Sequence, residues 1–129
     1  MITQLTRRSA LLTIYGLFEH GINGALGLMR DISGYTAHIK DGVTGQTHKV
    51  LTEVIGGNVR DVSHINKIRN IMAHNDGIVR DQDKRAVQRA ENEGADIKVI
   101  FGRAHLGGDF LDYVVTELSR YLKEMVEAI

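Results

Sequence analysis

Apolar residues recur at helical spacing over two long stretches, one toward each end of the chain. The first stretch runs from about Thr6 to Met29, and its periodic positions are Leu11, Ile14, Tyr15, Phe18, Ile22, Leu26 and Met29. The second begins after Asp109, a residue type that favours a helix N-cap. Its periodic positions are Leu111, Val114, Leu118, Tyr121, Leu122, Met125 and Ile129. The pattern therefore predicts a long helix in each stretch.

Glycines interrupt the first of these predicted helices at Gly16, Gly21, Gly24 and Gly27. Each costs roughly 1 kcal/mol relative to alanine inside a helix. This cost indicates either that another helix approaches closely or that the helix bends near Gly21. A kink without any functional role is the alternative interpretation.

Shorter elements are predicted between the two long helices. Residues 31–46 are interpreted as the ragged end of the first helix and a loop, and residues 47–55 as a short apolar-periodic segment. Gly56 and Gly57 end that segment, and Asn58 can cap the next helix. The stripe of this next helix is Val59, Val62, Ile65, Ile68 and Met72.

The segment Asn75-Asp76-Gly77 breaks this helix, and a more polar helix is expected from Asp81 or Gln82 to Gly94. The β-branched run 97–101 predicts a strand that turns at Gly102-Arg103 into residues 104–106 as a small hairpin. Two short strands are marginal alone, so the hairpin is expected to pack on the helices.

Composition is that of one ordinary globular domain spanning residues 1–129, with 43% hydrophobic residues and no cysteine. The absence of cysteine excludes disulfides, thiolate metal sites and cysteine nucleophiles. No apolar run approaches the ~20 residues of a membrane span, and no convincing signal-peptide cleavage site follows Met1. We therefore expect a cytoplasmic protein with no membrane contact.

Sixteen basic and sixteen acidic side chains cancel, so any contact with nucleic acid must be local. Basic residues outnumber acidic ones between Asn58 and Ala90, whereas the last predicted helix is acidic. An RNA-binding role in the basic region would fall to Arg60, Lys67, Lys84 and Arg85. The alternative is that these are ordinary solvated faces.

Several common chemistries lack their residues in this sequence. The six histidines form no His-x-x-x-His or His-Glu-x-x-His arrangement, so no metal is expected. No glycine-rich phosphate loop or nucleophile elbow is present either, and no cofactor is expected.

One cluster of residues suited to catalysis remains, formed by Arg69, Asn70 and His74. It lies at the end of the predicted helix whose apolar stripe runs from Val59 to Met72, which we call the motif helix. Asn70 and His74 are four residues apart and project from one face of a helix. The long stem of Arg69 can bring its guanidinium round to that face. A guanidinium can hold a phosphate through two hydrogen bonds, and an imidazole can move a proton beside it. A structural alternative is a histidine that caps the helix and an arginine that pairs with an acid.

The segment Arg69-Asn70-x-x-Ala73-His74 resembles the Arg-x-x-x-x-His signature of the HEPN superfamily, and the chain is most similar to the small prokaryotic branch related to RiboL-PSP HEPN proteins. The resemblance covers nearly the whole chain: a first helix that carries Glu19, the motif helix, a short extended segment and a final long helix. It implies an all-α HEPN-like helical bundle with a small β-hairpin before the last helix. It also implies a homodimeric, metal-independent ribonuclease with a shared active site, often a toxin or defence effector, with a cognate antitoxin or nucleotidyltransferase as a possible partner.

The chemistry implied by the motif needs no metal, because RNA carries its own nucleophile, the 2′-hydroxyl. We expect His74 to act as the general acid or base and Arg69 to bind the scissile phosphate, leaving a 2′,3′-cyclic phosphate. Asn70 would orient one of them or contact the phosphate, with Glu19 and Arg80 in supporting roles. The alternatives are a non-catalytic module of the same fold that binds RNA, nucleotide or protein, and a structural subunit of a defence complex.

Overall fold

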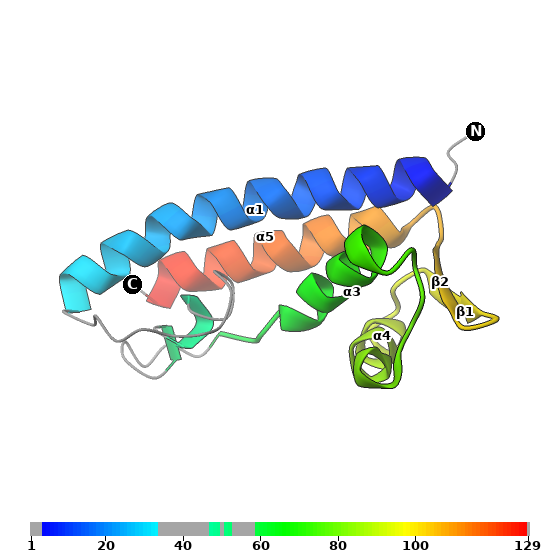
Figure 1. The fold of residues 1–129 in the computed structure, drawn as a ribbon. Helices are drawn as coiled ribbons and strands as arrows, with labels where there is room; N and C mark the ends of the chain where they lie inside the picture. The colour runs from blue at the N-terminus through cyan, green and yellow to red at the C-terminus, as the bar shows by residue number, and fades with distance from the viewer. Residues whose placement is uncertain (1–3, 34–46, 50, 53–58, 129) are drawn as a thin grey trace.

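Two long helices lie side by side and run in the same direction along the length of the molecule (Figure 1). They are α1 (Gln4–Ser33) and α5 (Phe110–Ala128). The computed structural model describes residues 4–33, 47–49, 51–52 and 59–128 of the chain. Within these residues the protein is mostly helical, with one small hairpin before the last helix, as the sequence predicts. No described helix combines the length and apolar character that a membrane crossing requires.

The apolar stripes of α1 and α5 face each other and form much of the core. The ring centroids of Phe18 and Tyr121 lie 6.0 Å apart in an edge-on contact between the two helices. Buried side chains of this kind each contribute roughly 1.5–3 kcal/mol relative to exposure. Leu122, predicted in the stripe, is 36% exposed and lies at its margin. The buried stripe residues are Leu11, Tyr15, Phe18, Ile22 and Leu26 in α1 and Val114, Leu118, Tyr121 and Met125 in α5.

The motif helix, α3 (Ser63–His74), packs beneath the two long helices and runs opposite to α1 (Figure 1). It begins later than the stripe of apolar residues predicts, because Val59 and Val62 are buried but precede it. Asn58, the predicted cap, lies outside the described residues, as do residues 50 and 53–55 of the predicted segment 47–55. Within that segment Leu51 is fully buried.

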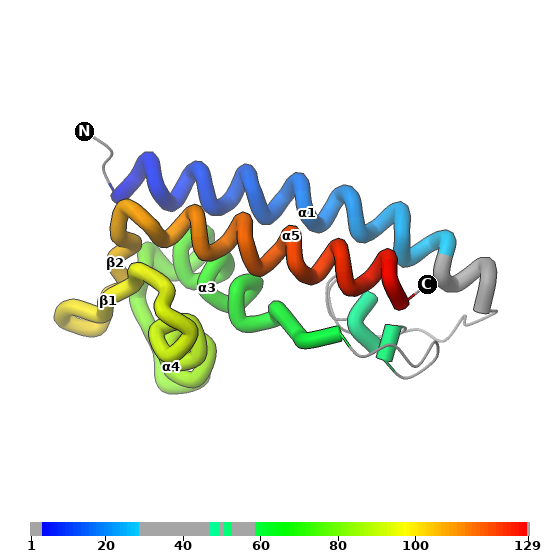
Figure 2. Tube along the Cα trace, turned by 180° about the vertical axis from the view of Figure 1, so that it is seen from behind, coloured from blue at the N-terminus to red at the C-terminus, as the bar shows by residue number. Residues whose placement is uncertain are grey.

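The predicted polar helix is confirmed as a short 3-10 turn, η2 (Asp81–Asp83), followed by α4 (Lys84–Asn92). Figure 2, from behind, shows α4 below α3 at the end of the molecule where α1 begins. Ala86, Val87 and Ala90 are buried, so one face of α4 packs on the core. The remaining face is left to charged side chains and solvent.

The predicted hairpin is confirmed as β1 (Ile97–Ile100) paired antiparallel with β2 (Arg103–Leu106). The turn between them is Phe101-Gly102, one residue earlier than predicted, with φ of 51° and 76°. The outer edge of β2 is covered near Leu106 by the side chain of Gln4, whose amide donates to the Leu106 carbonyl at 2.6 Å and accepts from its N–H at 2.8 Å. An isolated bridge from Ile78 to Arg103 covers the same edge further along. The hairpin is thus fixed to the helices at two points.

The glycines of α1 do not mark a break. The helix continues through Gly21, and no atom of the described residues would lie within 4 Å of a Cβ added at Gly16, Gly21, Gly24 or Gly27. Packing within the described part of the chain therefore does not account for glycine at these positions.

Candidate functional site

A row of polar side chains follows the solvent side of α3. Its members, Ser63, Lys67, Asn70 and His74, recur at steps of four, three and four residues, the spacing of one helical face. Ser63, Lys67 and His74 are exposed and Asn70 is half-buried, whereas the opposite side of α3 enters the core. We call this row the α3 polar stripe.

The three motif residues lie together at the C-terminal end of this stripe. Arg69 Nη1 donates a hydrogen bond to Asn70 Oδ1 at 2.9 Å, so the guanidinium turns toward the stripe as its long stem allows. Arg69 Nε is buried and has no partner in the described part of the chain. His74 is the last residue of α3, exposed, and without a hydrogen bond or ion pair to any described residue. An amide-held guanidinium and an open imidazole therefore share one end of α3.

The turn after His74 gathers further charge. Asp76 and Gly77 both have positive φ, 51° and 79°, and the Gly77 N–H closes the helix by donating to the Ile71 carbonyl at 3.0 Å. The Asp76 carboxylate accepts from Arg8 Nη1 and from Arg103 Nη1, each at 2.9 Å. The hydrogen bond from Arg8, with the charge and hydrogen bond of Arg103, lowers the pKa of Asp76. Two guanidinium groups share one carboxylate, so this cluster carries net positive charge.

The two residues predicted in supporting roles make no hydrogen bond or ion pair with Arg69, Asn70 or His74. Glu19 lies in α1, half-buried, and makes no hydrogen bond or ion pair with a described residue. Arg80 lies at the start of η2, where its N–H and Nε donate to Asp83 Oδ2 at 3.2 and 3.4 Å.

A groove of about 470 Å³ lies between α3 and the η2–α4 segment. We call it the α3–α4 groove. Two of the predicted RNA-binding residues, Lys67 and Arg85, face each other across it from α3 and α4. Its lining consists of Ser63, His64, Lys67, Asp81, Gln82, Arg85, Ala86 and Arg89.

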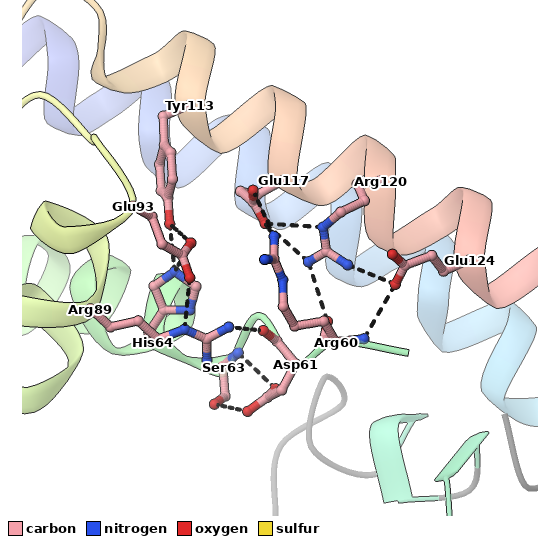
Figure 3. Close-up of polar contacts among 10 residues, drawn as sticks. All are labelled: Arg60, Asp61, Ser63, His64, Arg89, Glu93, Tyr113, Glu117, Arg120 and Glu124. Carbon is pink, nitrogen blue, oxygen red and sulfur yellow. Dashed lines mark hydrogen bonds and ion pairs between the residues drawn. The ribbon is translucent and has the colours of Figure 1, made fainter. Parts of the chain in front are cut away.

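The other two predicted RNA-binding residues are paired with acids. Arg60 Nη2 contacts Glu117 at 3.1 Å, and the backbone of Arg60 is also held by α5 through Glu124 and Arg120 (Figure 3). Lys84 pairs with Asp81 at 2.9 Å on the exposed side of α4. These pairs lower the net charge that Arg60 and Lys84 offer to a ligand.

A polar network that includes the buried His64 borders the α3–α4 groove, and Figure 3 shows its side chains. His64 Nε2 lies 2.7 Å from the Tyr113 hydroxyl, which donates to Glu93 Oε1 at 2.6 Å. Because the Tyr113 proton goes to Glu93, His64 Nε2 must carry a proton and donate to Tyr113, which leaves Nδ1 as an acceptor. Arg89 completes the network, donating to Glu93 Oε2 at 3.1 Å and to the Asp61 carbonyl at 2.5 Å.

Burial, and next the nearby Arg89 charge, lower the pKa of His64 to about 4, so its imidazole is neutral at pH 7. Partial burial of Glu93 opposes its ionisation, but hydrogen bonds from Tyr113 and Arg89 outweigh it and lower the pKa of this carboxyl. The sequence gives no signal for the network, because His64, Glu93 and Tyr113 come from three separate segments. The one related feature of the sequence is that His64 falls inside the motif helix.

Among the residues that the structure describes, no group of three or more histidine, aspartate or glutamate side chains is placed to hold a metal ion. Comparison of the chain with protein-family models, with curated proteins and with solved structures gives no match.

Proposed function

We propose that the protein is a metal-independent endoribonuclease of HEPN type whose active site includes Arg69, Asn70 and His74. The observation that carries the proposal is the hydrogen bond from Arg69 to Asn70, which holds the guanidinium beside the stripe that ends in the exposed imidazole of His74. A cation and a titratable base within reach of one phosphate are the groups that RNA cleavage through the 2′-hydroxyl requires.

In this mechanism the scissile phosphate binds to the Arg69 guanidinium. The 2′-hydroxyl of the preceding ribose loses its proton to an imidazole and attacks the phosphorus. The bond to the 5′-oxygen breaks, and that oxygen takes up a proton. The products are a 2′,3′-cyclic phosphate and a 5′-hydroxyl, and Arg69 stabilises the charge that builds on the phosphate oxygens.

One motif supplies one imidazole, whereas the reaction both removes and delivers a proton. We therefore propose a two-fold dimer in which two motifs face one cleft, so that each subunit contributes an arginine and a histidine. The solvent side of α1 supports such an arrangement, since its four glycines leave open space for a second helix. Leu17 and Leu28 on α1 are 69% and 57% exposed and would be covered by it.

The cleavage proposal is tested with purified protein and labelled single-stranded RNA in excess EDTA. We expect cleavage to persist and the new ends to carry cyclic phosphates. Cleavage that stops in chelator and returns with a divalent ion would contradict the mechanism. RNA binding without any cleavage would identify the protein as a binding module of the same architecture.

We further propose that the protein acts as a toxin or defence effector, because a ribonuclease without an evident sequence-reading module would damage host RNA. Induced expression should arrest growth, and His74→Ala should relieve the arrest at equal soluble protein. Equal growth with both proteins would contradict this role.

A further inference from the structure

The α3–α4 groove is separate from the motif but lies along the same helix face. We propose that this groove binds a backbone phosphate of the RNA strand at a short distance from the cleavage site, and so sets the path of the strand along α3. The inference rests on the proposed ribonuclease function for the position of the cleavage site, but binding in the groove can be measured without cleavage.

The first support is that two basic side chains of the groove, Lys67 and Arg85, have no carboxylate partner among the described residues. Lys67 Nζ contacts only the Gln82 carbonyl, at 3.5 Å, and Arg85 is exposed with no hydrogen bond or ion pair to a described residue. Asp81, the carboxylate in the lining, is paired with Lys84 on its outer side. Two cations thus face the groove without a carboxylate partner in the described part of the chain. An anion with several oxygens, such as a phosphate, fits between them.

The helix ends at the groove do not add to this charge. At the start of α3 the Asp61 carboxylate accepts from the Ser63 N–H at 2.9 Å and from the Ser63 hydroxyl at 2.6 Å. At the start of α4 the N-cap residue is Asp83. The positive ends of both helix dipoles therefore already have acidic neighbours, and the attraction for an anion comes from Lys67 and Arg85.

The second support lies beside the groove. Nδ1 of His64 is a buried acceptor without a donor among the described residues, and the His64 side chain is 3% exposed. A phosphate oxygen cannot bind this acceptor directly, because neither atom carries a proton. Folded proteins satisfy nearly all buried polar atoms, so we expect a water that donates to Nδ1 and to a phosphate oxygen to connect the two.

The geometry favours an RNA strand over a free nucleotide because the groove and the motif lie along the same polar stripe of α3. Lys67 and His74 belong to the same α3 polar stripe and are seven residues apart, or about 10 Å along the helix axis. A short length of single-stranded RNA can span that distance, so one strand can place one phosphate in the groove and another at Arg69.

The test measures binding of a short fluorescent RNA with 2′-O-methyl groups, which lacks the nucleophile and cannot be cleaved by this chemistry. Dissociation constants are determined over a range of salt concentrations for the wild type, Lys67→Ala, Arg85→Ala and the double variant. The control is Lys98→Ala, an equal loss of charge at an exposed position of β1. Thermal unfolding of each variant verifies that it is folded.

We expect both groove variants to weaken binding and Lys98→Ala to leave it unchanged. Each lost phosphate contact should reduce the slope of log K against log salt by about 0.7. Groove variants that bind like the wild type would overturn the inference. A ribonucleoside monophosphate that competes as well as the RNA would overturn the assignment to a strand.

The outcome separates this inference from the cleavage proposal. If the wild type does not cleave RNA but the groove variants weaken binding, the phosphate site stands and the ribonuclease function fails. If the wild type cleaves RNA and the groove variants bind and cleave as it does, the function stands and the groove has no part in it.

Discussion

His64 Nε2 lies 2.7 Å from the Tyr113 hydroxyl oxygen, and this contact connects the first turn of α3 to α5 across the core. The contact requires a neutral His64 that donates from Nε2, because the Tyr113 proton is held by Glu93. Protonation of the ring would place a charge among buried groups beside Arg89. The stability of the fold is therefore linked to pH through this residue.

We expect the free energy of unfolding to fall as the pH is lowered from about 6.5 to about 4. In that window the unfolded chain binds a proton at His64 and the folded protein, with a His64 pKa of about 4, does not. The loss can reach about 3 kcal/mol across the whole window. Urea unfolding at a series of pH values measures it, and His64→Gln should flatten the profile.

The carboxyl groups whose pKa is lowered change the stability of the fold only at lower pH. Asp61, Asp76 and Glu93 stabilise the fold above their unfolded pKa values of about 4, and that contribution is lost only below this range. Measurements above pH 5 therefore isolate His64. An unchanged slope in His64→Gln above pH 5 would show that the network does not control the titration.

Removal of either motif side chain should reduce RNA cleavage with little effect on folding. We expect His74→Ala to lower the rate about 10²–10⁴-fold, the usual contribution of a general acid or base. Arg69→Ala should lower it about 10²–10³-fold, as for the loss of one charge-stabilising donor. His105→Ala, in β2, is the control. A folded His74→Ala protein with wild-type activity would place the chemistry elsewhere.

The proposed shared site predicts complementation between inactive proteins. Mixed Arg69→Ala and His74→Ala chains should form heterodimers in which one intact arginine and one intact histidine come from different subunits. Some activity should return relative to either variant alone. Light scattering establishes the oligomeric state, and a monomer that cleaves RNA would contradict the shared site.

Gly24→Ala distinguishes an open helix face from a dimer interface. Nothing in the described part of the chain would contact the added Cβ, so within one subunit the substitution should stabilise the helix by roughly 0.5–1 kcal/mol. If a second helix packs on this face, the added methyl should weaken the dimer. Sedimentation at a series of concentrations, together with thermal unfolding, separates the two effects; tighter dimers would exclude close packing at Gly24.

Gly77→Ala should destabilise the protein by about 1–2 kcal/mol from backbone strain alone, since φ is +79°. A Cβ there would also lie 2.6 Å from Arg8 Nη2 and would displace a guanidinium that binds Asp76. Gly94→Ala is the matched control, because φ is +89° and nothing lies within 4 Å. Thermal unfolding should show a greater loss of stability for Gly77→Ala than for Gly94→Ala. Equal losses would mean that the Arg8 side chain moves aside without destabilising the protein.

The sequence predicts the long helices and the hairpin well because their apolar spacing directly reflects burial. The start of α3 is predicted less well for the same reason. Val59 and Val62 continue the apolar spacing and are buried, yet they precede the helix. Burial at helical spacing does not require that the backbone be helical.

The motif cluster could be predicted because its residues are close in the chain, and Arg69 does turn toward Asn70. Which basic residues are paired with acids could not be predicted, because the partners lie far away in the chain. Arg60 and Lys67 look alike in sequence, but Arg60 pairs with Glu117, 57 residues away, while Lys67 faces the groove.

The side-chain amide of Gln4 makes two hydrogen bonds to the backbone of Leu106, as a neighbouring strand would, although Gln4 lies 102 residues away in the chain. A protease that removed the first turn of α1 would leave the backbone groups of Leu106 open to pairing with another molecule. A cut that also removed Arg8 would leave Asp76, next to the end of the motif helix, bound by Arg103 alone. Trimming a few residues from this end of α1 would thus promote aggregation and loosen the candidate active site together.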